Sequence, residues 1–328
     1  MNTVIRSQLL RFSVGRGQQF RFSTAAANGN DLVIGTVDET LGIAMLTMNR
    51  PPANSLSLEM NEAICTSLKT MESNPKIQSV ILSSSNPKIF SAGLDVSELV
   101  SPHPDRLPKF WNSLQQLYLD LYGSRLAVVA AIQGHAPAAG CFLAMACDYR
   151  IMSSGDIGGE GGGDMKKRFV PTIGLNETQL GIAAPPWMGQ LLVRTIGFRQ
   201  AELALAMGTL FPPDRALSIG LVDAIESEQH GAESTIIEGL SELLPSISKD
   251  QASNPLMQKA FKQATTFAKI PPHARVASKL VTRQSHIHDM IATRDEDTAH
   301  FCGFVTQEAV QKNLIAYVEA MKSKSKKK

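Results

Sequence analysis

Short apolar runs alternate with amphipathic stretches along the first two thirds of the chain. Five runs of five to seven residues carry apolar and β-branched residues, which is typical of strands. These predicted strands are Gly42–Met48, Ser79–Ser84, Leu126–Ile132, Asp148–Met152 and Leu221–Ile225. Between them, apolar residues recur at helical spacing. The predicted helices are Leu56–Met71, a stretch from about Leu107 to Tyr122, and Gly140–Cys147.

The pattern changes at about residue 229, beyond which it is helical almost to the end. Strands that alternate with helices for about 200 residues, followed by helices alone, indicate an α/β core with a helical C-terminal part. We therefore expect a core over residues 31–228, a helical region over 229–321 and a solvated lysine-rich tail over 322–328. No internal repeat is evident.

A glycine-rich segment interrupts the core at about residues 153–168, where Ser153–Asp164 reads SSGDIGGEGGGD. Glycine-rich loops cradle phosphates when they lead into the N-terminus of a helix without carboxylates in the way. Here Asp156, Glu160 and Asp164 are interleaved with the glycines. We interpret the segment as a surface insertion rather than a phosphate-binding loop.

The net charge of +2 over 328 residues hides an uneven distribution. Residues 1–30 carry four arginines and no acid, and residues 322–328 carry five lysines, which leaves a net charge of −7 on residues 31–321. An acidic body disfavours binding to nucleic acid, which requires clustered lysine and arginine on a folded face. The apolar run Leu126–Ile132 has seven residues, far short of the roughly 20 of a membrane-spanning helix.

Residues 1–30 predict a mitochondrial transit peptide. Arginines recur every five residues among Leu, Ile, Val and Phe, with serine and threonine and without acids. This is the composition of cationic amphipathic import signals. We therefore expect the protein to reside in the mitochondrial matrix.

Three segments of small residues carry the candidate chemistry. They are Phe90–Asp95 (FSAGLD), Gln133–Cys141 (QGHAPAAGC) and Gly174–Gly181 (GLNETQLG). The first two are turns at strand ends, where backbone N–H groups can hold an oxygen anion. The third places Glu177 among apolar and glycine residues, and partial burial raises a glutamate pKa toward that of a general base. Two N–H donors and one carboxylate are sufficient to abstract a proton beside a carbonyl.

The chain resembles the crotonase (enoyl-CoA hydratase/isomerase) superfamily over about residues 32–321. The matching segments come in the order and near the spacing of that superfamily, and within it they are most similar to the mitochondrial Δ3,Δ2-enoyl-CoA isomerases. They include NRPPANSLS (Asn49–Ser57), FSAGLDVSEL (Phe90–Leu99), Gly134–Arg150 with CDYR, IGLNETQLGI (Ile173–Ile182), FPPDRALSIGLVD (Phe211–Asp223) and FCGFVTQEAVQKNL (Phe301–Leu314). The resemblance implies a spiral of ββα units, as in crotonase and ClpP, with a C-terminal helical region that forms trimers.

The resemblance also implies roles for individual residues. An acyl-CoA thioester would bind along Ala92, Gly93, Leu94, Asp95 and Val96 and at Ala139. Its thioester oxygen would accept hydrogen bonds from the backbone N–H groups of Leu94 and Ala139. The departure at Ala139, where a relative of this kind has glycine, keeps that N–H.

One position separates two activities within the superfamily. Hydratases of this superfamily use two glutamates, one of which falls at Glu177 and the other at Phe142. A phenylalanine cannot hold a water, whereas a single base can take a proton from C2 and return it at C4. The resemblance therefore implies an isomerase of unsaturated fatty-acid β-oxidation that converts 3-cis- or 3-trans-enoyl-CoA to 2-trans-enoyl-CoA.

Three alternatives stay open at this point. They are an enoyl-CoA hydratase or another crotonase-type enzyme, an acyl-CoA-binding protein inactivated by the glycine-rich insertion, and an RNA-binding member of the superfamily, which the acidic body disfavours. The isomerase hypothesis implies an acyl-CoA substrate, a homotrimer, no metal and no cofactor beyond the CoA of the substrate. Arg194, Lys279 and Arg283 are candidates by charge alone for the CoA phosphates, and Trp187 either lines the acyl pocket or packs in the core.

Overall fold

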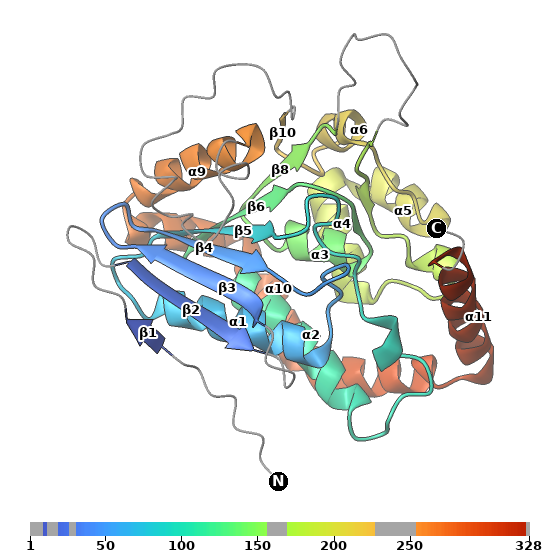
Figure 1. The fold of residues 1–328 in the computed structure, drawn as a ribbon. Coiled ribbons are helices and arrows are strands. Elements are labelled where there is room, and N and C mark those ends of the chain that lie inside the picture. The colour runs from blue at the N-terminus through green and yellow to red at the C-terminus, as the bar shows by residue number, and fades with distance from the viewer. Residues whose placement is uncertain (1–8, 12–18, 26–30, 156–168, 227–253, 326–328) are drawn as a thin grey trace.

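The computed structural model describes residues 9–11, 19–25, 31–155, 169–226 and 254–325. At its centre lies an eight-stranded sheet with the order β1-β2-β3-β4-β5-β6-β8-β10 (Figure 1). Strands β1 to β4 pair antiparallel, and β4, β5, β6, β8 and β10 pair parallel. The bounds are β1 Leu9–Arg11, β2 Gln19–Ala25, β3 Asp31–Asp38, β4 Ile43–Met48, β5 Ser79–Ser84, β6 Ala127–Ile132, β8 Tyr149–Ser153 and β10 Ala224–Glu226. A second sheet consists of the short parallel strands β7 (Ala136–Pro137) and β9 (Ile173–Gly174).

Helices cover both faces of the large sheet. The α-helices are α1 Leu58–Glu72, α2 Leu107–Tyr122, α3 Ala139–Met145, α4 Pro186–Ile196, α5 Phe198–Met207, α6 Pro213–Ser218, α9 Pro255–Ala268, α10 Pro272–Val305 and α11 Glu308–Ser325. Two 3₁₀ helices, η1 (Val96–Glu98) and η2 (Glu177–Leu180), lie in the connections. Within the described ranges, no helix combines the length and the apolar character that crossing a bilayer requires.

Alternate residues of the central strands point to the two faces, as the pleat of a strand requires. In β4, Ile43 and Met45 belong to a cluster that α9 covers with Leu256, Ala260 and Phe261. Ala44 and Leu46 belong to the larger core on the opposite face, against which α1 packs (Figure 1). Burial on both faces explains why these strands are continuously apolar rather than alternating in sequence.

Helix α1 illustrates how the sequence specifies a helix in this core. The Ser57 hydroxyl caps its N-terminus by accepting a hydrogen bond from the Met60 N–H at 3.3 Å. Met60, Ile64, Leu68 and Met71 then recur on one face, and all four are buried. A serine cap followed by apolar residues at a spacing of three and four directs that face onto the sheet.

Most predicted elements are confirmed, with ends that differ by one or two residues. The exception is the predicted strand Leu221–Ile225, because pairing with β8 starts only at Ala224. Leu221 and Val222 are apolar because they are buried in the turn after α6, not because they form a strand. Helices α9, α10 and α11 occupy the chain from Pro255 to Ser325, whereas residues 229–253 lie outside the described residues.

The N-terminal segment predicted to be a transit peptide supplies two strands to the full-length chain. Strand β2 pairs with β3 from Gln19↔Asp38 to Thr24↔Val33, and β1 lies outside β2. Its removal would leave β3 as the edge of the sheet. Leu32, Val33 and Val37 of β3 belong to the larger core, so β3 remains packed without β2.

Candidate functional site

Backbone pairings join three turns beyond the C-terminal ends of β5 and β6. The turn after β5 pairs with the turn after β6 through a bridge between Ile89 and His135, with Phe90 N–H donating to His135 O at 2.9 Å. The second turn continues into β7, which pairs in parallel with β9 at Ala136↔Ile173 and Pro137↔Gly174. The three small-residue segments predicted to carry the chemistry are thus held side by side.

The first candidate donor, Leu94, lies where the turn after β5 runs beside the segment that leads into α1. Leu56 N–H donates to Gly93 O at 2.8 Å, and Asp95 N–H donates to Leu56 O at 3.0 Å. These two bonds leave the intervening Leu94 N–H without an acceptor among the described residues. A backbone N–H held in this way is available to bind an oxygen from outside the chain.

The second candidate donor, Ala139, begins α3 after an unusual residue. Ala138 has φ 50° and ψ −126°, a conformation that L-residues rarely adopt, and its N–H donates to Gly174 O at 2.8 Å. The N–H groups of Cys141 and Phe142 turn back to Ala138 O. The N–H of Ala139, in the first turn of α3, finds no acceptor in the described part of the chain.

The turn after β5, which contains Leu94, and the turn after β6, which leads to Ala139, are in close contact at Gly93. We call them the first and second donor turns. This glycine has φ 88°, and an added Cβ would lie 3.0 Å from Ala138 Cβ and 3.1 Å from Ala139 N. Only glycine therefore fits this point without displacing the second turn. Because Leu94 follows Gly93 directly, the two free N–H groups lie in the same small region.

Glu177 reaches this region through the pairing of β7 with β9. Glu177 lies three residues after Gly174, which pairs with Pro137 two residues before Ala139. Its side chain also lies near α3, because its negative charge contributes, after burial, to the raised pKa of the Cys141 thiol. The register of two short strands therefore sets the carboxylate beside the N-terminus of α3.

Burial raises the pKa of Glu177 into the range of a general base. The residue is only 7 % exposed, and its Oε2 has no hydrogen-bond partner within the described residues. Burial penalises the ionised form and raises the pKa from 4.5 to about 7. A carboxylate with a pKa near neutrality gains and releases a proton at physiological pH.

The remaining predicted binding residues have different positions in the turn after β5. Ala92 is exposed, whereas Leu94, Asp95 and Val96 are half-buried. The Asp95 carboxylate caps η1 by accepting from Ser97 N–H at 3.1 Å and pairs with Arg50. Its side chain therefore stabilises the turn.

Sequence reasoning did not single out Asn54, whose hydrogen bonds hold the first donor turn in place. Asn54 is 1 % exposed, and its Nδ2 donates to Ser84 Oγ at 2.8 Å and to Phe90 O at 3.2 Å. Its carbonyl oxygen accepts from Ser91 Oγ at 2.8 Å. Its inclusion in the NRPPANSLS segment was the one available signal, since a lone asparagine does not indicate such a role.

The residues on either side of the glycine-rich insertion lie next to each other. Residues 156–168 lie outside the described residues, but Gly155 and Phe169 on either side are adjacent, because an added Cβ on Gly155 would lie 2.2 Å from Phe169 O. Past this point Thr172 N–H donates to His135 Nδ1 at 3.1 Å, and β9 then pairs with β7. The register that places Glu177 is therefore set after the insertion, by residues 172–174.

Aromatic side chains surround Phe142, the position at which we expect a hydratase to carry a second glutamate. Phe142 is fully buried, with its ring centroid 5.0 Å from that of Trp187 and 5.6 Å from that of Tyr118. The Trp187 indole donates to Asp297 Oδ2 at 3.1 Å. Trp187 therefore packs in an aromatic cluster with Phe142 and Tyr118, and the residue remains partly exposed.

The basic residues considered for the CoA phosphates lie elsewhere. Lys279 and Arg283 of α10 pair with Asp148 at 2.9 and 3.1 Å, and Asp148 also accepts from Val128 N–H at the start of β6. This cluster lies at the N-terminal ends of the parallel strands, opposite the three turns. Arg194 binds His286 and Thr282 O on the same side of the molecule.

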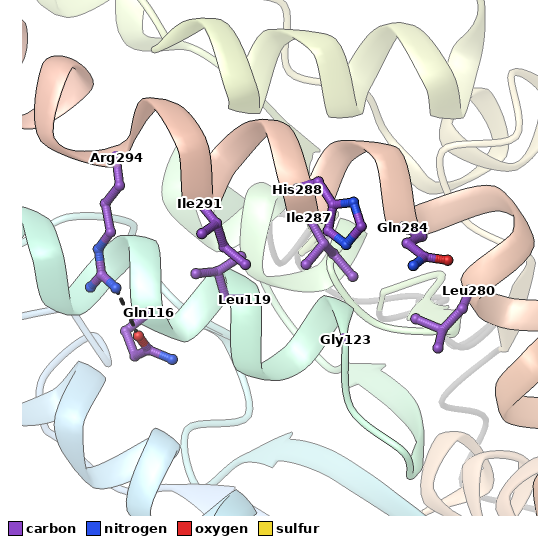
Figure 2. Close-up of a pocket in the computed structure, with 9 residues that line it drawn as sticks. All are labelled: Gln116, Leu119, Gly123, Leu280, Gln284, Ile287, His288, Ile291 and Arg294. Carbon is purple, nitrogen blue, oxygen red and sulfur yellow. Dashed lines mark hydrogen bonds between the residues drawn. The ribbon is translucent and has the colours of Figure 1, made fainter.

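The groove of Figure 2 is separate from the three turns. It measures about 560 Å³, and it lies between α2 and α10. Leu119, Leu280, Ile287 and Ile291 give it an apolar floor, with Arg294 donating to Gln116 at one end. It contains none of the predicted site residues. Across the described ranges, no group of three or more His, Cys, Asp and Glu is placed to hold a metal.

Comparison with known proteins agrees with the fold. Residues 38–254 match the enoyl-CoA hydratase/isomerase family. The chain is 36 % identical to the mitochondrial enoyl-CoA delta isomerase 1 of Rattus norvegicus over 97 % of both chains, and 26 % identical to the methylglutaconyl-CoA hydratase of the same species over 86 % of this chain and 78 % of the other.

Solved structures give the same result. The crystal structure of human mitochondrial Δ3-Δ2-enoyl-CoA isomerase superimposes with a TM-score of 0.75 at 35 % identity, covering 90 % of this chain and 99 % of that one. An enoyl-CoA hydratase from Bacillus halodurans, at 21 % identity and a TM-score of 0.68 over 87 % of this chain and all of the other, shares the fold. The predicted α/β fold of the crotonase type is confirmed, and the chain belongs to the enoyl-CoA hydratase/isomerase family.

Proposed function

We propose that this chain is an isomerase that moves the double bond of a 3-enoyl-CoA to the 2-trans position. The observation that carries the proposal is the buried carboxylate of Glu177, whose pKa is raised to about 7 beside two backbone N–H groups that have no acceptor among the described residues. The 36 % identity to mitochondrial enoyl-CoA delta isomerases of rat and human supports the same activity.

The reaction follows from these groups. The thioester oxygen accepts hydrogen bonds from Leu94 and Ala139 N–H, which makes the C2 protons more acidic. Ionised Glu177 removes one C2 proton, and the electron pair delocalises over a dienolate whose oxygen the two N–H groups stabilise. Protonated Glu177 then delivers the same proton to C4, the double bond settles between C2 and C3, and the carboxylate is regenerated. No atom is gained or lost, so the reaction requires no cofactor beyond the CoA of the substrate.

Phe142 favours isomerisation over hydration. Addition of water across a 2-enoyl-CoA is helped by a second carboxylate that holds the water, and α3 carries no acidic residue. Phe142 is instead enclosed by Tyr118 and Trp187. A phenylalanine at this position cannot hold a water for addition to C3, which leaves Glu177 as the base of the proposed reaction.

The rest of the proposal concerns location and assembly. The rat relative that this chain matches along 97 % of its length is mitochondrial, and residues 1–30 have the composition of an import signal. We place the protein in the mitochondrial matrix, with residues 1–30 as its transit peptide and 31–228 as its catalytic core. The C-terminal helices over 229–321 would form a homotrimer.

The pH dependence of turnover tests the proposal. The full chain is given 3-enoyl-CoA and, separately, 2-enoyl-CoA, and isomerisation and hydration are measured between pH 5 and pH 9. Because the ionised carboxylate is the base, kcat/KM for isomerisation should fall about tenfold per pH unit below a midpoint near 7 and reach a plateau above it. Hydration faster than isomerisation would refute the proposal and favour a hydratase.

A further inference from the structure

The C-terminal helix α11 contacts two segments of the proposed site. One is the segment that follows Leu94, and the other is η2, which begins with Glu177. Helix α11 follows α10 after a short turn, and Val310 and Leu314 on one of its faces are 5 % and 0 % exposed. Two polar residues beside this face, Gln311 and Asn313, contact the segments that follow the donor turn and the base. Neither was a candidate on sequence grounds.

Gln311 makes the first contact, and all the polar atoms of its side-chain amide take part. Its Oε1 accepts from Ser101 N–H at 2.8 Å, and its Nε2 donates to Leu99 O at 2.8 Å and to Val305 O at 2.7 Å. Leu99 ends η1, and η1 follows the donor residue Leu94 closely. Ser101 has φ 47°, a conformation that costs a residue with a Cβ about 1 kcal/mol or more. The bond to Gln311 helps to hold it there.

Asn313 makes the second contact, on the segment of the base. Gly181 ends η2, the 3₁₀ helix that begins with Glu177, and it has φ 74°. An added Cβ on Gly181 would lie 2.5 Å from Asn313 Nδ2 and 3.1 Å from its Cγ. The side chain of Asn313 is therefore in direct contact with the backbone that ends η2.

Because α11 contacts both the segment after Leu94 and the end of η2, its position sets the distance between these two segments. The N–H of Leu94 must meet the thioester oxygen while Glu177 meets C2 and C4 of the same substrate, so the spacing of the two halves sets the geometry of the reaction. We propose that α11 braces the site, with Gln311 and Asn313 as positioning residues that hold the donor turn and the base at their working separation. This inference rests on the proposed isomerase activity and deepens it.

The test compares Gln311→Ala with Gln307→Ala in the full chain. Gln307 lies four residues earlier in the chain, in the connection just before α11, is exposed, and makes no side-chain hydrogen bond to a described residue, so it serves as the control. A shift of less than 1 Å between base and donors should lower kcat of Gln311→Ala by about 10-fold. KM should stay within about twofold, because a positioning defect acts on the transition state more than on binding. Gln307→Ala should match the unmodified chain.

Hydrogen exchange gives a readout that does not depend on activity. In Gln311→Ala, but not in Gln307→Ala, the amides of residues 94–101 and of 177–182 should both exchange faster. If Gln311→Ala does not fold, Gln311→Glu, which keeps the acceptor for Ser101 N–H, takes its place with a smaller loss of kcat.

Two outcomes would overturn the brace while leaving the isomerase proposal in place. One is a kcat equal to that of Gln307→Ala, and the other is unchanged exchange over residues 177–182. Conversely, an unmodified chain that does not isomerise 3-enoyl-CoA would refute the activity, and the exchange measurement would still decide whether α11 couples the two segments.

Discussion

Replacing Glu177 by glutamine should lower isomerisation of 3-enoyl-CoA by about 10³-fold or more, because the residue acts as both base and acid in one turnover. Glutamine has nearly the same shape, and Oε2 of Glu177 has no partner among the described residues, so the variant disrupts no hydrogen bond of that atom. The measurement is kcat at pH 8, where the carboxylate of the unmodified chain is ionised. Retention of near-normal turnover would exclude Glu177 as the base.

The same variant should be more stable than the unmodified chain. The pKa of Glu177 rises from its ordinary value of 4.5 to about 7 in the folded state, so folding favours its protonated form. The contribution of Glu177 to the free energy of unfolding is therefore fully present below pH 4.5. It falls as the pH rises from 4.5 and is lost once the pH passes 7, by about 3 kcal/mol in all. At pH 8 Glu177→Gln should recover much of that loss as a higher Tm, and at pH 4 it should recover little. A variant that lost activity and also lost stability at pH 8 would indicate a structural role instead.

Replacing Gly93 by alanine should lower kcat/KM by about 10²-fold, which is the effect of losing one oxyanion donor. The added methyl would lie 3.0 Å from Ala138 Cβ and 3.1 Å from Ala139 N, so the two donor turns must separate. The defect lies in the transition state, and kcat should fall more than KM rises.

Gly197→Ala is the matched control for this variant. Gly197 has φ 82°, close to the 88° of Gly93, but a Cβ added there meets nothing within 4 Å. Both substitutions place alanine at a positive φ, which costs a residue with a Cβ about 1–3 kcal/mol. Only Gly93→Ala should lose activity, and equal activities of the two variants would show that the contact between the turns does not matter for catalysis.

The sequence predicted those parts of the fold that depend on local pattern. Helix α1 follows from the spacing of Leu58, Ile64, Leu68 and Met71, and the central strands follow from continuous apolar runs. Strands β7 and β9 have two residues each and show no periodicity, so they were not predicted, although their pairing places Glu177. The run Leu221–Ile225 was misassigned because burial in a turn and burial in a strand select the same apolar residues.

The sequence indicated the candidate site residues themselves, but not the residues that hold them in position. Small residues at strand ends pointed to the two turns, the resemblance to the crotonase superfamily assigned Leu94 and Ala139 within them, and a carboxylate among apolar residues pointed to Glu177. The supports come from distant positions, as with Gln311, which bonds to Leu99 and Ser101 more than 200 residues away in sequence. Such contacts depend on how the helices pack on the sheet, and no local pattern encodes them.

The central claim is that one buried carboxylate carries a proton from C2 to C4, and isotope transfer tests it most directly. A 3-enoyl-CoA with both C2 hydrogens replaced by deuterium is converted in ordinary water in a single turnover, and the product is examined for deuterium at C4. Because Glu177 is only 7 % exposed, the deuteron it accepts should be delivered before it exchanges with solvent. We predict product that carries deuterium at C4. Product that carries only solvent hydrogen at C4 from the first turnover would contradict the one-base mechanism.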